Sequence, residues 1–360
     1  MQPLKNLRVV ELATVLAGPS VGTFLAELGA TVIKVEHPDR PDVTRSWKLP
    51  SEAPSASISA YFASANAGKE YIQLDWKSTQ DQHVLLEMLG TADVLLTNFR
   101  DFSRCPGVLQ PAAFTLRNPR LIYCQLDGYS STPGRAAYDV VLQAETGYTA
   151  MNGTPESGPT KLPLAFMDLN AAHQMKQAIL LALYEREKTG KGALIRCSLE
   201  RAALANLANQ AANWLMGNHV PRPTGSLHPN IAPYGETFTC MDGQLLVLAI
   251  GSNAQFAGLL EVLSLDLADD PRFATNADRV VHRTALADLL TPVIAQETAA
   301  HWSQLFQAKS IPAGQVRSMD QVFESDYAQS LLWEEDIDGQ PTVRPTTVGF
   351  SVSGLATPVS

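Results

Sequence analysis

Apolar and polar positions in the first third of the chain alternate between the patterns of strands and helices. The β-branched run 7–12 predicts a strand, and the run 31–36 predicts a second one. Between them, apolar residues at helical spacing follow Pro19 and stop at Gly29, which predicts a helix. Further strands are predicted at 71–76, 93–99 and 120–126, and further helices at 78–90 and near 108–117. This alternation indicates an α/β fold with a mainly parallel sheet, in which ligands bind at the carboxyl ends of the strands.

The rest of the chain predicts more helices and a smaller second unit. The clearest helix covers 169–187 and stops at the turn 189–192, ahead of a strand at 193–199. Two strands joined by a hairpin are predicted around Asp242-Gly243, after the Pro-rich linker 221–233. Other helices are predicted at 138–151, 199–217, 253–263, 282–297 and 299–308.

Composition excludes several classes of protein. The 360 residues are 45% apolar and 18% charged, which permits a full core and argues against disorder. The net charge of −9 argues against nonspecific binding to nucleic acid or an anionic membrane, because both need a basic face. Without a long apolar span, the chain is expected to have no membrane or export segment. Its four cysteines form no CxxC pair, which indicates reduced thiols in a cytoplasmic protein.

The standard motifs of nucleotide, zinc and hydrolase sites are missing from the sequence. GxGxxG, GxxxxGK[ST], HExxH and GxSxG do not occur, and the seven histidines show no metal-ligand spacing. This pattern disfavours a dinucleotide dehydrogenase, a P-loop NTPase, a zinc protease and an α/β-hydrolase, and we expect no metal site.

A series of short motifs in unbroken order provides the positive signal. The series reads LAGPSVGTFLAELGATVIKVEHPD, NAGK before YIQLDWK, ADVLLTNFR, NPRLIYCQLDGY, YDVVLQAETG, PLAFMDLNAAHQ, YEREKTGKGALIRCSL, HPNIAPY and DDPRFATNADRVVHR. It resembles the family III CoA-transferases, a group that includes formyl-CoA transferases, carnitine CoA-transferases and α-methylacyl-CoA racemases. The resemblance covers about residues 5–320, nearly the whole chain.

The resemblance implies a fold and a set of partners. It implies a Rossmann-like large domain with a parallel sheet, a smaller α+β domain and an interlocked, ring-like homodimer. The expected divisions are a CoA-binding domain at 1–200, a linker at 201–224, a small domain at 225–312 and a return segment at 313–360 that completes the large domain. Acyl-CoA and a small carboxylic acid are the implied substrates, so coenzyme A is a substrate and no tightly bound cofactor is expected.

Asp168 is the candidate nucleophile. From the residues alone, it is either an ordinary acidic residue favoured by the helix dipole or an ionised carboxylate aimed at a carbonyl. The resemblance favours the second role, because the family carries its nucleophilic aspartate here. Asp168 would attack the thioester to form a mixed anhydride, and the released CoA thiolate would then form an aspartyl-CoA thioester. Both steps develop an oxyanion that needs N–H donors.

Tyr138 and Asn253 separate transfer from racemisation. The resemblance implies that Tyr138 lies near the thioester, where the racemases carry a histidine, and that Asn253 replaces a racemase glutamate. Racemisation needs proton donors and acceptors on both faces of the substrate carbon, so this pair favours transfer. Gly251 could supply an N–H donor in the place of the family's glycine-rich loop. It could equally belong to an ordinary turn capped by Ser252 or Asn253.

Positions for CoA binding follow from the same resemblance. Val15, Leu16 and Ala17 match the turn that borders the pantetheine, while Lys69 and the triplet 98–100 match the rest of the CoA path. The matching residues are Val15, Leu16, Ala17, Lys69, Asn98, Phe99 and Arg100. A cation at Lys69 or Arg100 suits a phosphate. Arg45 and Arg104 are further phosphate candidates without a defined position, and His173 is expected to be an ordinary helix histidine.

The sequence departs from the family at three places. Leu16 stands where some transferases have glutamine, Asp101-Phe102 replaces a common Pro-Gly, and the loop at 251–253 has a single glycine. CoA transfer therefore has two alternatives, a 2-methylacyl-CoA racemase and a CoA-binding subunit without catalytic activity.

Overall fold

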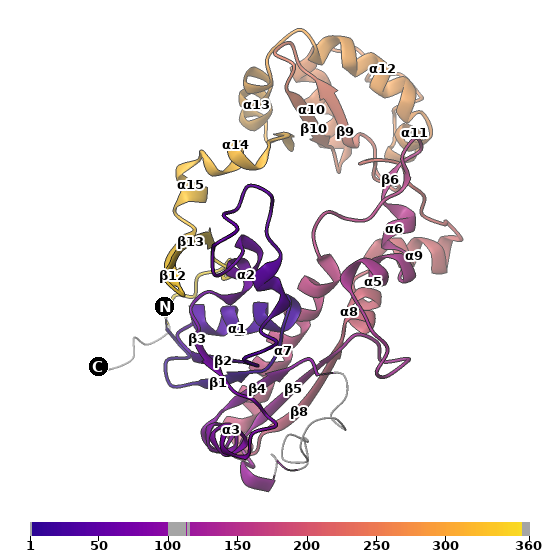
Figure 1. Ribbon diagram of the computed structural model, residues 1–360. Helices are drawn as coiled ribbons and strands as arrows, with labels where there is room; N and C mark the ends of the chain where they lie inside the picture. Colours follow the sequence, from indigo (N-terminus) through magenta and orange to yellow (C-terminus); the bar gives the residue numbers. More distant parts are fainter. Residues whose placement is uncertain (1, 100–112, 114–115, 355–360) are drawn as a thin grey trace. The chain divides into compact units, whose positions relative to one another are not determined.

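The computed structural model describes residues 2–99, 113 and 116–354, which form two compact units. The first unit contains Met1–Asn152, Pro159–Arg222 and Tyr327–Ser360, and the second contains Gly153–Gly158 and Pro223–Asp326. Figure 1 follows both units by colour, the first mainly indigo to magenta and the second mainly orange. The chain therefore leaves the first unit and later returns to it.

A six-stranded sheet, in which every strand pair is parallel, forms the centre of the first unit. Its strand order is β3-β2-β1-β4-β5-β8, so the chain winds outward in one direction from β1 and in the other direction from β4. The strands are β1 (Arg8–Glu11), β2 (Thr31–Glu36), β3 (Glu70–Gln73), β4 (Val94–Thr97), β5 (Ile122–Asp127) and β8 (Ala193–Ser198). The predicted α/β class with a parallel sheet is confirmed. In such a fold the crevice between β1 and β4 is where ligands bind.

Helices cover both faces of this sheet because successive strand residues point to opposite sides. Val9 packs with α1 (Ala17–Glu27) and α7 (Phe166–Thr189) in one core, while the next residue, Val10, packs with α3 (Thr79–Thr91) in another. The same unit contains η1 (Val43–Ser46), α2 (Ala60–Asn66), α5 (Asp139–Glu145), α6 (Tyr148–Met151), α8 (Leu199–Ala205) and α9 (Ala208–Gly217).

Two predicted helices are each broken in the structure. The predicted helix at 138–151 is divided into α5 and α6 by Gly147, whose φ of 90° lies in the left-handed region. The predicted helix at 199–217 is divided into α8 and α9 near Ala208, whose φ of 46° is also left-handed. A left-handed residue cannot continue a right-handed helix, and the apolar spacing alone did not reveal either break.

The second unit has its own antiparallel sheet and its own core. The predicted hairpin is confirmed: β9 (Tyr234–Thr239) and β10 (Leu245–Ala249) pair around Asp242-Gly243. The end of the small domain that the sequence predicts, at residue 312, falls just before β11 (Ala313–Gln315). This strand pairs with β10 on the side opposite to β9. The helices are α10 (Asn253–Leu263), α11 (Asn276–Val281), α12 (Arg283–Ile294), α13 (Ala299–Ala308) and α14 (Met319–Phe323). Two short strands, β6 (Gly153–Thr154) and β7 (Gly158–Pro159), lie where the chain first passes from one unit to the other. Helix α15 (Asp326–Gln329) lies where the chain returns to the first unit.

The returning segment forms a hairpin that packs against the rest of the first unit. Strands β12 (Leu332–Ile337) and β13 (Gln340–Pro345) pair antiparallel. The Arg344 guanidinium lies 2.6 Å from the Glu27 carboxylate, with both side chains almost fully buried. At the turn of the hairpin, Asp338 lies 2.7 Å from Arg45. These ion pairs tie the hairpin to α1 and to the segment after β2.

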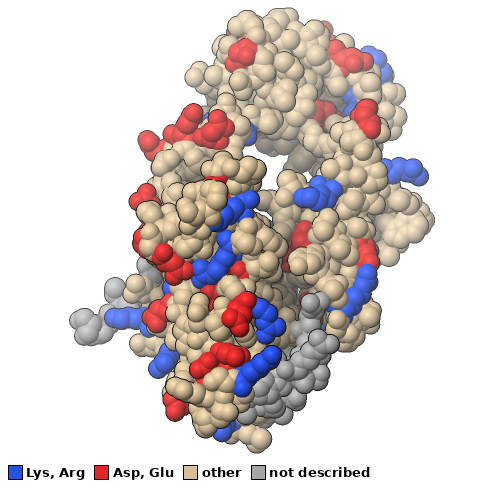
Figure 2. Space-filling view, in the orientation of Figure 1, with Lys and Arg blue, Asp and Glu red and all other residues tan. Residues whose placement is uncertain are grey.

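The surface shown in Figure 2 mixes both signs of charge. Lys and Arg side chains are interspersed with Asp and Glu over both units. Within the part of the chain that the structure describes, no helix has the length and apolar character needed to cross a membrane.

Candidate active site

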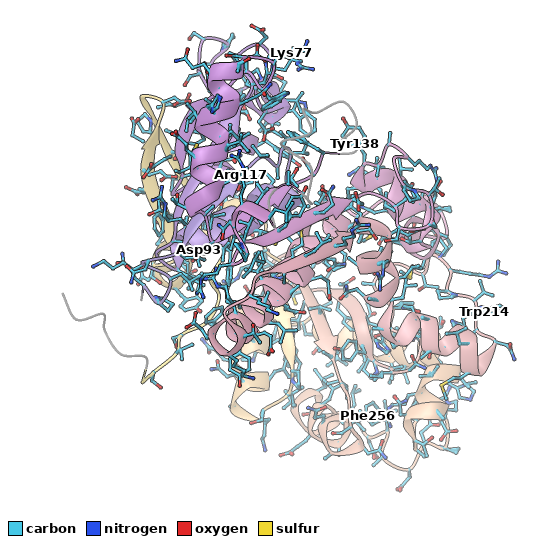
Figure 3. The ribbon with its side chains drawn as sticks, turned by 90° about the horizontal axis from the view of Figure 1, so that it is seen from below. Lys77, Asp93, Arg117, Tyr138, Trp214 and Phe256 are labelled. Carbon is cyan, nitrogen blue, oxygen red and sulfur yellow. The ribbon has the colours of Figure 1, made fainter. Side chains whose placement is uncertain are left out.

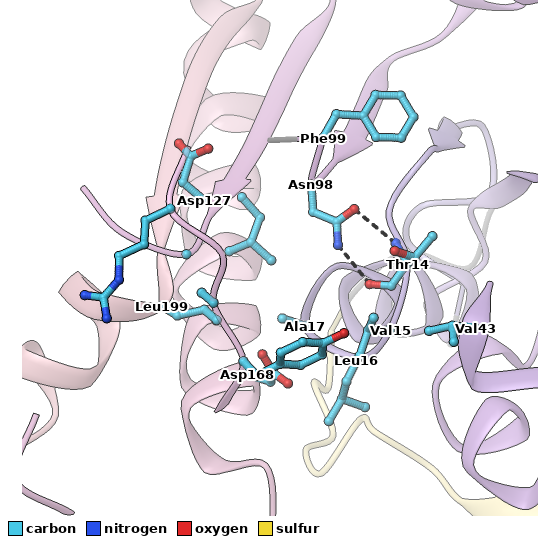
Figure 4. Close-up of a pocket in the computed structure, with 15 residues that line it drawn as sticks. Thr14, Val15, Leu16, Ala17, Val43, Asn98, Phe99, Asp127, Asp168 and Leu199 are labelled. Carbon is cyan, nitrogen blue, oxygen red and sulfur yellow. Dashed lines mark hydrogen bonds between the residues drawn. The ribbon is translucent and has the colours of Figure 1, made fainter. Parts of the chain in front are cut away.

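A pocket of about 360 Å³ opens at the carboxyl ends of β1, β4 and β5 in the first unit. It lies at the point where the winding of the sheet changes direction, which is the usual ligand site of this fold. Figure 4 shows contributions from the loop after β1, the end of β4 and the start of α7. Seven of the predicted site residues line it: Val15, Leu16, Ala17, Asn98, Phe99, Tyr138 and Asp168. The fold therefore gathers residues that are up to 153 positions apart in the sequence, from Val15 to Asp168.

Asp168 lies in the first turn of α7, which begins at Phe166. The residue before the helix, Ala165, offers no side-chain cap. Instead, the Asp139 carboxylate accepts the N–H of Met167 at 2.6 Å and that of Asp168 at 3.4 Å. Asp139 itself follows Tyr138 at the start of α5. The nucleophile candidate therefore shares its end of the helix with a second carboxylate.

Burial and the nearby Asp139 carboxylate raise the pKa of Asp168 to about 7. Removing a carboxylate from water disfavours its charged form, and a second negative charge adds to this effect. The sequence predicted a fully ionised carboxylate at neutral pH, supported by the helix dipole. A pKa of about 7 instead leaves the carboxylate only partly ionised at neutral pH, chiefly because it is buried and also because Asp139 brings a second negative charge.

Two tyrosines belong to the same region. Tyr138 lines the pocket with a side chain that is 57% exposed, and Figure 3 shows it at the surface of the first unit. Tyr61 is half-buried, and burial together with Asp168, Asp139 and Asp42 raises its pKa to about 12. Tyr61 is therefore a neutral hydroxyl at neutral pH.

Lys69 does not line the pocket, which corrects its predicted contact with CoA phosphate. Its side chain is fully buried, and its ammonium lies 2.9 Å from the Glu11 carboxylate. The ammonium also donates to Asn66 and to the carbonyls of Pro19 and Ala65. Burial lowers the pKa of Lys69 to about 7. Because its ammonium is surrounded by buried acceptors, Lys69 has a structural role next to α1.

The Asn98 amide is also occupied. Its oxygen accepts the N–H of Thr14 at 3.2 Å, and its nitrogen donates to the Thr14 carbonyl at 2.9 Å (Figure 4). The main contribution of Asn98 to the pocket is therefore that it fixes the loop after β1.

Gly251 belongs to the second unit, where its N–H donates to the Gln255 side chain at 2.9 Å. Ser252 caps α10 by accepting the N–H of Gln255, so this segment forms the ordinary capped turn that the sequence left open. The Asn253 side chain accepts from Arg279 at 2.8 Å. The Gly251 N–H, which the sequence predicts as an oxyanion donor, is thus already bonded to the Gln255 side chain.

The remaining predicted positions lie elsewhere. Arg100 and Arg104 fall outside the described residues. Arg45 is engaged by Glu36 at 2.6 Å and by Asp338 at 2.7 Å, so its charge is balanced by two carboxylates. His173 is exposed on α7 and is not among the described residues that line the pocket.

Sequence reasoning missed four charged residues around the pocket, of which Asp127 lines it at the end of β5. Asp139 supports the start of α7, Asp42 accepts the N–H of Val15, and Arg135 lines the pocket while pairing with Glu145 at 2.6 Å. The signal for Asp139 was its place directly after Tyr138. Asp42 and Arg135 stand in turn-rich segments, where neither spacing nor periodicity distinguishes a functional charge from a surface charge.

Comparison with known proteins decides the family. The sequence matches the family CoA-transferase family III over residues 4–359. The chain belongs to this family. A succinate–glutarate CoA-transferase of Agrobacterium fabrum is 33% identical over 99% of this chain and 89% of its own length. An acetyl-CoA:oxalate CoA-transferase of Acetobacter aceti is 36% identical over 87% of this chain and 80% of its own length.

A solved structure shows the same fold. The crystal structure of a CAIB/BAIF family protein from Brucella suis superposes with a TM-score of 0.81 at 35% identity, covering 98% of this chain and 93% of that one. This CoA-transferase is therefore an enzyme that acts on CoA thioesters, and its pocket at the β1/β4 crevice is the candidate site for that reaction.

Proposed function

We propose that this enzyme transfers CoA between an acyl-CoA and a free carboxylic acid, with Asp168 as the nucleophile. A carboxylate oxygen of Asp168 attacks the thioester carbonyl, the C–S bond breaks, and CoA leaves as a thiolate. The thiolate attacks the aspartyl carbon and expels the donor acid, which leaves an aspartyl-CoA thioester. The acceptor carboxylate then expels the thiolate to form a new anhydride. Thiolate attack on the acceptor acyl carbonyl releases the new acyl-CoA and frees Asp168. No net proton is consumed.

The observation that carries this proposal is a partly buried Asp168 in the pocket wall with a pKa of about 7. At neutral pH a substantial fraction of the carboxylate is ionised, and it is more basic than an ordinary aspartate. A more basic carboxylate is the better nucleophile, and its anhydride is less easily lost to water in a partly buried pocket.

The loop after β1 is the candidate source of oxyanion stabilisation. Helix α1 begins at Ala17 in the pocket wall, and Leu16 before it provides no side-chain cap. The first N–H groups of a helix have no partner within the helix, so the start of α1 favours a developing negative charge. This assignment replaces the one expected for Gly251.

Mass spectrometry of the intact protein tests the proposal. After incubation with a panel of acyl-CoAs, we expect the mass to increase by one CoA, with the adduct located in the peptide that contains Asp168. Oxalyl, succinyl and glutaryl thioesters belong in the panel because the relatives are named for these acids. The absence of any adduct, together with hydrogen exchange at Cα in heavy water without an acceptor, would favour the racemase instead.

We also propose that the chain works as a homodimer. Helix α9 has no buried residue, although Trp214, Leu215 and Met216 are apolar and 49%, 76% and 87% exposed. Figure 3 shows Trp214 at the outer edge of the ribbon. A group of large exposed apolar side chains marks an interaction surface, and a second copy of the chain would cover it. Sedimentation equilibrium is expected to give twice the mass of 38.9 kDa. A monomer at micromolar concentration would contradict this proposal.

A further inference from the structure

The loop after β1 is held at three successive residues by the side chains of Lys34 and Asp42, which are buried, and of Asn98, which is half-buried. Lys34 donates to the Ala13 carbonyl at 2.9 Å. Asn98 binds both backbone groups of Thr14, as Figure 4 shows. The Asp42 carboxylate accepts the N–H of Val15 at 3.1 Å. We call the three side chains Lys34, Asp42 and Asn98 the loop clamp.

Val15 explains why a clamp is needed. Its φ of 74° lies in the left-handed region, where a β-branched side chain is strained. Such a conformation persists only when its surroundings impose it. Without the bond from its N–H to Asp42, the loop would relax toward the extended region. Thr14, Val15, Leu16 and Ala17 form the pocket wall, so relaxation would move that wall.

Asp42 and Lys34 also support each other. The Lys34 ammonium is fully buried and lies 3.0 Å from Asp42 and 3.1 Å from Glu11. Together with the Ala13 carbonyl, these acceptors use all three ammonium donors. Asp42 is further fixed by the Thr44 hydroxyl at 2.7 Å and the Thr44 N–H at 3.1 Å. Buried charges with this many bonds are rigid, because any displacement leaves a charge unpaired.

We propose that Asp42, supported by Lys34, is a positioning residue for CoA transfer: it holds the Val15 segment so that the start of α1 meets the reacting carbonyl beside Asp168. The inference rests on the proposed function, because it takes the pocket as the site of transfer. Asp42 is buried away from the substrate and acts through the loop alone. A misplacement of about 1 Å at such a site costs about 100-fold in rate.

The experiment compares Asp42→Asn with Glu27→Gln. Glu27 is the matched control, because it is a buried carboxylate that accepts the N–H groups of Thr347 and Val348 and pairs with Arg344 away from the pocket. Both variants are expected to lose thermal stability. Only Asp42→Asn is expected to lower kcat by about 10- to 100-fold, with KM for acyl-CoA changed by less than about threefold, since its effect falls on the transition state.

Two variants with milder substitutions test the proposal if Asp42→Asn does not fold. Thr44→Val removes the hydroxyl that fixes Asp42, while Thr23→Val removes an equally buried hydroxyl that donates to the Ala65 carbonyl. Thr44→Val is expected to lower kcat by about 3- to 10-fold, in keeping with the loss of one hydrogen bond, and Thr23→Val is not. The proposal is overturned if kcat falls equally in Asp42→Asn and Glu27→Gln, or equally in the two threonine variants.

Two different measurements test this inference and the proposed function. The rate of overall transfer decides the role of Asp42, whatever the covalent intermediate is. The mass of the wild-type protein decides the role of Asp168. A wild-type enzyme that transfers CoA without an aspartyl adduct would refute the nucleophile and leave the comparison of Asp42 with Glu27 intact.

Discussion

Replacing Asp168 with asparagine is expected to lower kcat for CoA transfer by at least about 1,000-fold, the scale seen when a covalent nucleophile is removed. The amide has nearly the same shape, so the pocket should persist while the attacking oxygen is lost. Asp127→Asn is the control, because Asp127 is another carboxylate in the pocket wall and has no assigned step. We expect the control to lose less than about tenfold, and a similar loss in both variants would contradict the nucleophile.

The same substitution is expected to raise the melting temperature at pH 8 more than at pH 5. The folded-state pKa of Asp168 is about 7, above the unfolded value, so the folded state binds the proton more tightly. Stability from this group therefore falls as pH rises from about 4 to about 7. Asparagine carries no charge and avoids this loss. An unchanged or lower melting temperature at pH 8 would show that burial of the Asp168 charge costs nothing.

Replacing Asp139 with asparagine is expected to move the acid limb of the kcat/KM profile to lower pH by about one unit, the scale of a close like charge. Attack needs the ionised form of Asp168, so the wild-type rate should fall as pH drops below about 7. The variant removes a negative charge beside Asp168, which lowers the pKa of the nucleophile. The amide oxygen can still accept the Met167 N–H, so the start of α7 remains capped.

Glu145→Gln is the control for the pH profile. Glu145 lies on the same helix as Asp139, and its carboxylate is used by Arg135 and Tyr129 instead of by α7. The nearby Tyr61 stays neutral through this range, because its pKa is raised to about 12. We expect the acid limb of Glu145→Gln to coincide with that of the wild type. An acid limb that does not move in Asp139→Asn would assign it to another group.

The α/β fold was predictable because it depends on periodicity. Val9 and Val10 point to opposite faces of a buried strand, and the resulting apolar run is visible in the sequence. The breaks at Gly147 and Ala208 were not predictable, since they depend on a single backbone angle within segments of good helical spacing. The β11 strand was missed because three residues are too few to show a period.

The candidate site was predictable only where the motif series covers it. Asp168, Tyr138 and the 15–17 turn do line one pocket. Lys69 was placed wrongly, because a lysine bound to buried acceptors and one that contacts a phosphate look the same in a sequence. Its role depends on Glu11, which is 58 positions away in the chain. The pKa of Asp168 likewise depends on features that a sequence does not show, chiefly the burial of its side chain and also the nearby Asp139 carboxylate.

The ion pair between Glu27 and Arg344 has a consequence for the order of folding during synthesis. The second unit, Pro223–Asp326, leaves the ribosome before the β12–β13 hairpin exists. Domains fold as units once their chain is available. The second unit, which begins later in the chain, can therefore be completed before the first unit. Until Arg344 arrives, the Glu27 carboxylate at the end of α1 lacks its ion-pair partner, so we expect the first unit to be completed after the second.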